Sequence, residues 1–296
     1  QDNIANNIRN RKENCMKTKN KYNLFRAKIM RPIQLELPLH RGIEETPQAI
    51  FAQSISEQTS IKYRESTIWK AGSINEFSDD GGYFAFGKVS LADLELFDNS
   101  KQDFYKIKHS IGLHSIVVYS KKYELLAIQV NHKLGKTEKT AERLQAILRK
   151  SQVIVQNGLY LSISKINDPK KFIFKLREAY AIKQLRATFS RPNPFDADEK
   201  FQKPSAEVLQ AVNGDEGSTV FKGTKLDQKA VEAISRSTVA TGNIARARIL
   251  TKQNSHLSTI STEGDPYTLT YDEEDVEPSK VHKDMIRVYK EIWDGE

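Results

Sequence analysis

The chain has 296 residues, of which 38% are hydrophobic and 28% are charged. These proportions exclude a wholly disordered chain and suit a protein of two folded domains. We find no apolar run of about 18 residues that would predict a membrane span, and the N-terminus lacks the apolar core of a signal peptide. The single cysteine, Cys15, cannot form an internal disulfide. We therefore expect a cytoplasmic protein.

The formal net charge of +8 is unevenly distributed. Residues 101–191 contain 19 Lys and Arg against 6 Asp and Glu (19 − 6 = +13), and residues 1–31 contain 9 against 2 (+7). Residues 263–296 contain 4 against 11 (−7). Basic surfaces concentrate polyanions, of which nucleic acid is the most common in cells. The acidic end has three interpretations: a solvated helix face, a competitor for the basic middle, or a contact with a second copy.

The first half of the chain is predicted to be rich in β-structure. A strand is expected near residues 22–37, and a helix follows Thr46-Pro47, a cap and first-turn pair that would bury Ile50, Phe51 and Ile55. Further strands are expected at residues 83–89, 114–119 and 125–130, with Lys121-Lys122 in a turn.

The second half alternates helical and strand patterns. Helices are expected at residues 137–150, after Asp168-Pro169, after Asp227 and from Ser279 to Ile292, and a half-buried strand covers residues 184–189. Asn157-Gly158 between apolar runs predicts a hairpin, and residues 244–251 and 267–271 are expected to pair. The fold class is thus α+β. We expect a β-rich N-terminal domain (1–140) and a C-terminal domain (141–296) with helices on one side of an antiparallel sheet and a turn-rich linker at 191–226.

The motifs that usually carry catalysis are missing from the sequence. There is no glycine-rich phosphate loop, no paired CxxC and no H-E-x-x-H, so we predict no catalytic residue, no metal ligand and no cofactor. A metal-dependent nuclease is kept as an alternative. Its closest pattern is residues 125–133, where Gln129 stands in place of the second carboxylate and Asp103 could supply the first.

The basic residues carry the functional prediction. Arginine binds phosphate bidentately, and lysines in the first turn of a helix add to the partial positive charge of its free amide groups. The candidate nucleic-acid-binding residues are Lys121, Lys122, Lys136, Lys139, Arg143, Lys170, Lys171, Arg186, Arg191, Arg246 and Arg248. Few aromatic residues are interleaved with them, so we expect contacts to the backbone, with little dependence on base sequence, more than base stacking.

A pattern in the second half resembles a group of phage-related proteins. The run from Leu159 to Ile166 precedes a lysine-bearing helix, Glu263-Gly264-Asp265 lies in a later turn, and Glu277-Pro278-Ser279 precedes the last helix. In this order the chain resembles the RexA-like prophage exclusion proteins and, more loosely, the KwaB-like anti-phage defence proteins. The resemblance implies a DNA-binding homodimer that senses phage infection together with a second protein of a defence system.

We therefore expect electrostatic, sequence-tolerant DNA binding, with duplex DNA favoured, by a homodimer in anti-phage defence. A metal-dependent nuclease, a protein-interaction module and an RNA-binding protein remain alternatives.

Overall fold

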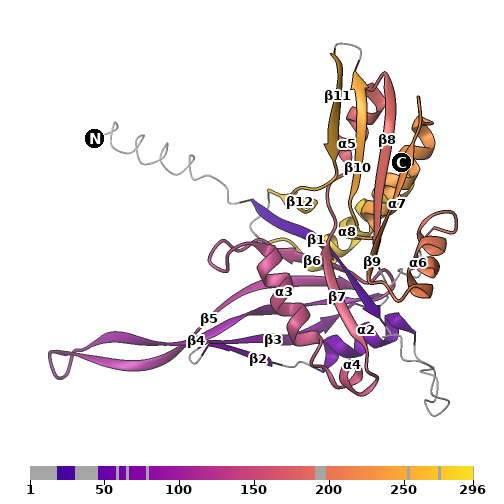
Figure 1. Cartoon of the computed structure of the whole chain (residues 1–296). Coiled ribbons are helices and arrows are strands. Elements are labelled where there is room, and N and C mark those ends of the chain that lie inside the picture. Colours follow the sequence, from indigo (N-terminus) through magenta and orange to yellow (C-terminus); the bar gives the residue numbers. More distant parts are fainter. Residues whose placement is uncertain are drawn as a thin grey trace, which may run out of the picture.

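Two antiparallel β-sheets form the frame of the protein, so the fold class is α+β as predicted (Figure 1). The computed structural model describes residues 19–30, 46–57, 60–64, 67–77, 80–190, 198–251, 254–272 and 275–295. The first sheet has the strand order β12-β1-β6-β5-β4-β3-β2, and β7 also pairs with β1. Its strands are β1 (Asn20–Met30), β2 (Ser60–Arg64), β3 (Thr67–Glu76), β4 (Gly82–Asp98), β5 (Asp103–Ser120), β6 (Leu125–Gln129), β7 (Tyr160–Lys165) and β12 (Thr268–Tyr271).

Helices cover both faces of the first sheet. One face packs against α2 (Pro47–Ser56), α3 (Thr137–Leu148) and α4 (Gln152–Gln156). The other packs against α8 (Pro278–Asp294), whose predicted apolar stripe of Val281, Met285, Val288 and Ile292 is buried. The predicted start of α2 is confirmed, because Thr46 Oγ1 accepts a hydrogen bond from the Ala49 amide and Ile50, Phe51 and Ile55 are buried.

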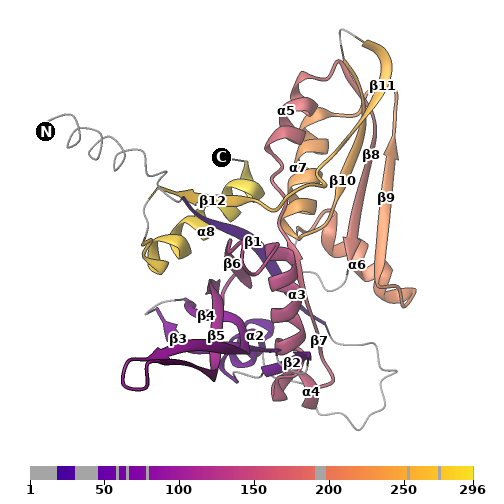
Figure 2. The ribbon, with the colours of Figure 1, turned by 90° about the vertical axis from the view of Figure 1, so that its left-hand side faces the viewer.

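The second sheet has helices on one face, which confirms that prediction. Its strands, in the order β11-β10-β8-β9, are β8 (Ala181–Ser190), β9 (Glu216–Lys222), β10 (Ala245–Thr251) and β11 (Asn254–Ser261). The helices are α5 (Lys170–Glu178), α6 (Gln202–Ala211) and α7 (Gln228–Ala240). Figure 2 shows α5 and α7 together on one side of these strands. Among the described residues, no helix is both long and apolar enough to cross a membrane.

A long two-stranded ribbon projects from the first sheet (Figure 1). The pairing of β4 with β5 runs from Gly82↔Tyr119 to Asp98↔Asp103, but β3 accompanies β4 only as far as Ser90. Residues 91–110, which we call the β-arm, therefore have no neighbouring strand among the described residues. They extend over about eight residues per strand, or roughly 26 Å at 3.3 Å per residue.

The expected division of the chain at residue 140 does not match the sheets. β7, β12 and α8 come from the second half of the sequence, yet they join the first sheet. β12 pairs with Asn20–Asn23 and β7 with Phe25–Met30, so the two short strands follow each other along β1. The reason is that β1 has room for partners on both sides, and β6 occupies only one of them.

Three local predictions were wrong. Residues 191–226 are not all linker, because α6 and β9 lie within them and bury Leu209 against the second sheet. The hairpin at Asn157-Gly158 is instead the end of α4, which buries Val153 and Ile154 and turns at Gly158 with a φ of 59°. Residues 267–271 do not pair with β10, whose partners are β8 and β11.

Two cations are buried on one face of β1, where the two sheets meet. Arg26 forms an ion pair with Glu124 at 3.8 Å and donates a hydrogen bond to the Tyr289 hydroxyl. Lys28, only 3% exposed, donates to Ser190 Oγ on β8 at 3.1 Å. Burial, followed by repulsion from Arg26, lowers the pKa of Lys28 from 10.5 to about 7.

This pKa predicts how stability depends on pH. Between about pH 7 and 10 the unfolded chain binds a proton at Lys28 that the folded chain does not, so the free energy of unfolding rises with pH by up to about 1.4 kcal/mol per unit. Lys28→Met lacks this contribution. Urea denaturation at pH 7.5 and 9.5 should therefore show the wild type gaining stability relative to Lys28→Met, whereas parallel pH profiles would contradict the lowered pKa.

Candidate nucleic-acid interface

The second sheet leaves one face without a covering helix in the described part of the chain (Figure 2). Side chains alternate across a strand, and in β8 Leu185, Ala187 and Phe189 are buried toward the helices. Gln184 and Arg186 point to the opposite, open face. The residues of β9, β10 and β11 that share this face follow from the strand register.

Three arginines gather at the centre of the open face. Arg186 on β8 is directly opposite Arg246 on β10, and Arg248 follows two residues along β10. We call Arg186, Arg246 and Arg248 the arginine face. Like charges directly opposite each other destabilise a sheet. Glu263 relieves part of this repulsion by pairing with Arg246 at 2.5 Å.

The other two arginines are exposed. Arg186 and Arg248 form no ion pair with any residue that the structure describes. Planar guanidinium groups that protrude in this way can each bind two oxygens of one phosphate. The arrangement therefore attracts a polyanion.

Polar side chains surround the arginine face. Lys222 on β9 lies opposite Gln184, and the hydroxyl residues Thr259 and Ser261 of β11 lie opposite Arg248 and Arg246. Lys222 is not among the predicted residues, because the linker expected at residues 191–226 includes β9. On the described strands β8, β9 and β10, no aromatic residue has the register of this face.

The other predicted basic residues do not join the arginine face. Lys121 and Lys122 lie in the turn before β6 of the first sheet, where Lys121 pairs with Glu76 at 2.7 Å. Lys136, Lys139 and Arg143 lie at the start of α3 and along it, and Lys139 pairs with Glu142. Lys170 and Lys171 occupy the first turn of α5 as predicted, and Lys170 donates to the Tyr267 hydroxyl. Arg191 lies outside the described residues.

The residues of the nuclease alternative are far apart. Asp103 is at the tip of the β-arm, opposite Asp98, whereas Gln129 ends β6 and accepts a hydrogen bond from the Ile116 amide near the other end of β5. Within the described residues, no three His, Cys, Asp or Glu side chains are grouped as a metal site. The structure therefore does not assemble the pattern that the sequence suggested.

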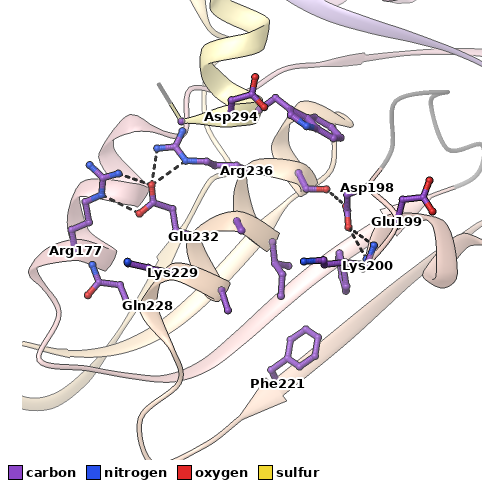
Figure 3. A pocket seen from close by; sticks show the side chains of 17 residues that line it. Arg177, Asp198, Glu199, Lys200, Phe221, Gln228, Lys229, Glu232, Arg236 and Asp294 are labelled. Atoms are coloured by element: carbon purple, nitrogen blue, oxygen red, sulfur yellow. Dashed lines mark hydrogen bonds and ion pairs between the residues drawn. The ribbon is translucent and has the colours of Figure 1, made fainter.

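A pocket of about 1240 Å³ opens on the helical side of the second sheet (Figure 3). Its cations are matched by carboxylates: Glu232 accepts hydrogen bonds from both Arg177 and Arg236. Burial alone would raise the pKa of Glu232, but these hydrogen bonds lower it below its usual value. Because its arginines are neutralised internally, this pocket is a poorer site for nucleic acid than the arginine face.

No protein-family model and no curated protein matches the sequence. The RexA-like and KwaB-like resemblance therefore remains an expectation.

Proposed function

We propose that the arginine face binds the phosphate backbone of duplex DNA. The observation that carries this proposal is the placement of Arg186 directly opposite Arg246, with Arg248 beside them, on an open sheet face. Cations held at this spacing are costly for the fold and favourable for a polyanion.

The chemistry of the face favours duplex over single strands. Proteins that hold single-stranded nucleic acid without sequence preference stack its bases on aromatic rings, and the strands β8 to β10 offer none on this face. Guanidinium and hydroxyl groups bind phosphate whatever the base sequence. Sequence-tolerant binding of duplex DNA follows, and a role in anti-phage defence rests on the resemblance alone.

Removing the arginine face should weaken binding and its dependence on salt. We expect Arg186→Ala/Arg246→Ala/Arg248→Ala to reduce affinity for duplex DNA. The plot of log affinity against log salt should flatten by about 0.9 for each phosphate that an arginine no longer neutralises. The measurement is a fluorescence anisotropy titration at several salt concentrations.

The matched control is Lys136→Ala/Lys139→Ala/Arg143→Ala, which removes the same formal charge from α3 on the first sheet. It should leave the salt slope near that of the wild type. Equal reductions in both triple variants would show that net charge and not the arginine face determines binding. Tighter binding to RNA than to duplex DNA would favour the RNA-binding alternative.

We also propose that the β-arm pairs with the β-arm of a second copy, which would give the expected homodimer. The two faces of the arm differ in chemistry. On one face two charged pairs, Asp93 opposite Lys108 and Glu95 opposite Lys106, lie between Leu91 and the Phe97–Phe104 pair at the tip. The other face carries apolar pairs, Leu94 opposite Ile107 and Leu96 opposite Tyr105, with Leu96 40% and Tyr105 46% exposed.

A second copy fits this apolar face. An isolated two-stranded ribbon is marginally stable in water, so the arm gains from a cover. The same face carries Lys88 at its base and Asp98 and Asp103 at its tip. In a two-fold pair of antiparallel arms, the acidic tip of each arm lies near the lysine of the other.

A charge placed within the apolar face should separate the two copies. We expect light scattering to give twice the chain mass of 33.8 kDa for the wild type and a single mass for Ile107→Asp. Phe104→Asp introduces the same charge on the other face of the arm, where Phe104 is 66% exposed, and should remain dimeric. A monomeric wild type, or a dimeric Ile107→Asp, would contradict the pairing.

A further inference from the structure

Lys28 is buried and forms no ion pair within 4 Å in the described part of the chain, and the more distant carboxylates of Glu216 and Glu124 offset its burial only in part. Its neighbour on the same face of β1, Arg26, has the carboxylate of Glu124. The partner of the Lys28 ammonium is a neutral hydroxyl, Ser190 Oγ, at 3.1 Å. One hydrogen bond to a hydroxyl does not offset the desolvation of an ammonium group, so a purely structural role explains Lys28 poorly.

Ser190 connects this lysine to a cavity. The serine is the last residue of β8 and lines a cavity of about 410 Å³ beside the arginine face, together with Thr188, Ser218 and Asn243. Its hydroxyl donates to Asn243 Oδ1 at 3.0 Å, and Asn243 Nδ2 donates to Thr241 Oγ1 at 2.9 Å. Lys28 is not among the lining residues, and its amine contacts the cavity lining through its hydrogen bond to Ser190.

We propose that Ser190 is a nucleophile, activated by Lys28 as general base, for acyl transfer from a small ester or amide. A buried lysine is poised for this role because desolvation brings its pKa to about 7, which leaves a neutral amine available at ordinary pH. A serine in the lining of a cavity, hydrogen-bonded to a lysine amine, is the arrangement of serine–lysine dyads.

The proposed reaction has two balanced steps. Ser190 turns its proton from Asn243 to the neutral Lys28 amine while Oγ attacks the carbonyl carbon, and the resulting ammonium then protonates the leaving alcohol or amine. This gives an ester on Ser190. Water attacks that ester while Lys28 again accepts a proton, and the Lys28 ammonium then returns it to Ser190 Oγ as the carboxylic acid leaves.

The charges in the cavity favour a neutral acyl group over a phosphodiester. One cation, Arg186, and one carboxylate, Glu216, line it. A phosphodiester carries a negative charge that a single cation facing a carboxylate would stabilise weakly, and its transfer would call for more cations around the transferred group. An uncharged ester or amide incurs no such penalty. The acyl reaction does not rest on DNA binding.

The test uses the full-length protein and a fluorophosphonate probe, which phosphonylates activated serines. Mass spectrometry of the wild type should locate the adduct on Ser190, and Ser190→Ala should remove it. Ser258→Ala, which removes an exposed hydroxyl of β11 that does not line the cavity, should label as the wild type does. Lys28→Met should slow labelling by at least about 100-fold.

A second readout keeps the proposal falsifiable if Lys28→Met fails to fold. The labelling rate of the wild type should rise with pH and level off above about pH 7, as Lys28 loses its proton. Wild-type labelling no faster than that of Ser190→Ala, or a rate independent of pH between 6 and 9, would overturn the proposal. Folded Ser190→Ala should still bind DNA as the wild type does, so the two proposals fail separately.

Discussion

The buried cationic face of β1 is the constraint on which the rest of the structure depends. β1 pairs with β6 on one side and with β7 and β12 on the other, so strands from both halves of the chain meet on it. Its side chains also reach outward: Arg26 contacts Tyr289 of α8, and Lys28 contacts Ser190 of β8. The second sheet is thereby linked to the first through the hydrogen bond of Lys28 to Ser190, and buried polar groups of this kind tolerate few other partners.

This attachment determines what the second sheet presents to solvent. The helices α5, α6 and α7 occupy one face, and α7 also contacts α8 through Arg236 and the Ile292 carbonyl. The opposite face stays open and carries Arg186, Arg246 and Arg248. At the end of β8 the same face leads into the cavity lined by Ser190. The arginine face thus lies beside the Ser190 hydroxyl, which accepts a hydrogen bond from the buried Lys28.

Local patterns in the sequence predicted much of this fold. The cap at Asp227 of α7 and the alternation of Leu185, Ala187 and Phe189 in β8 are short-range signals, and the structure confirms both. The pairing of strands that lie far apart in the chain was harder to predict from the sequence. β11 is polar and lacks a clear alternation of apolar and polar residues. β12 pairs with β1, about 250 positions earlier in the chain, at residues of β1 that β7 does not cover. No short window of sequence contains that information.

The same limit applies to the functional residues. Eleven basic residues were candidates, but only the strand register brings Arg186 opposite Arg246. Lys222 could not be predicted, because its strand β9 is mostly exposed and has the composition of a linker. Lys28 could not be predicted as part of a site. Nothing in the sequence around it distinguishes a buried lysine from a solvated one, and its partner Ser190 is 162 residues away. Charge counts favoured a polyanion as the ligand, and the strand register determines which of the basic residues lie together.

The most direct test of the central claim is a titration of the wild-type protein with fluorescent duplex DNA at low and at high salt. Contacts between the arginine face and phosphates predict binding at low salt that weakens steeply as salt rises, without dependence on base sequence. Absence of binding at low salt, or binding that does not respond to salt, would contradict the account.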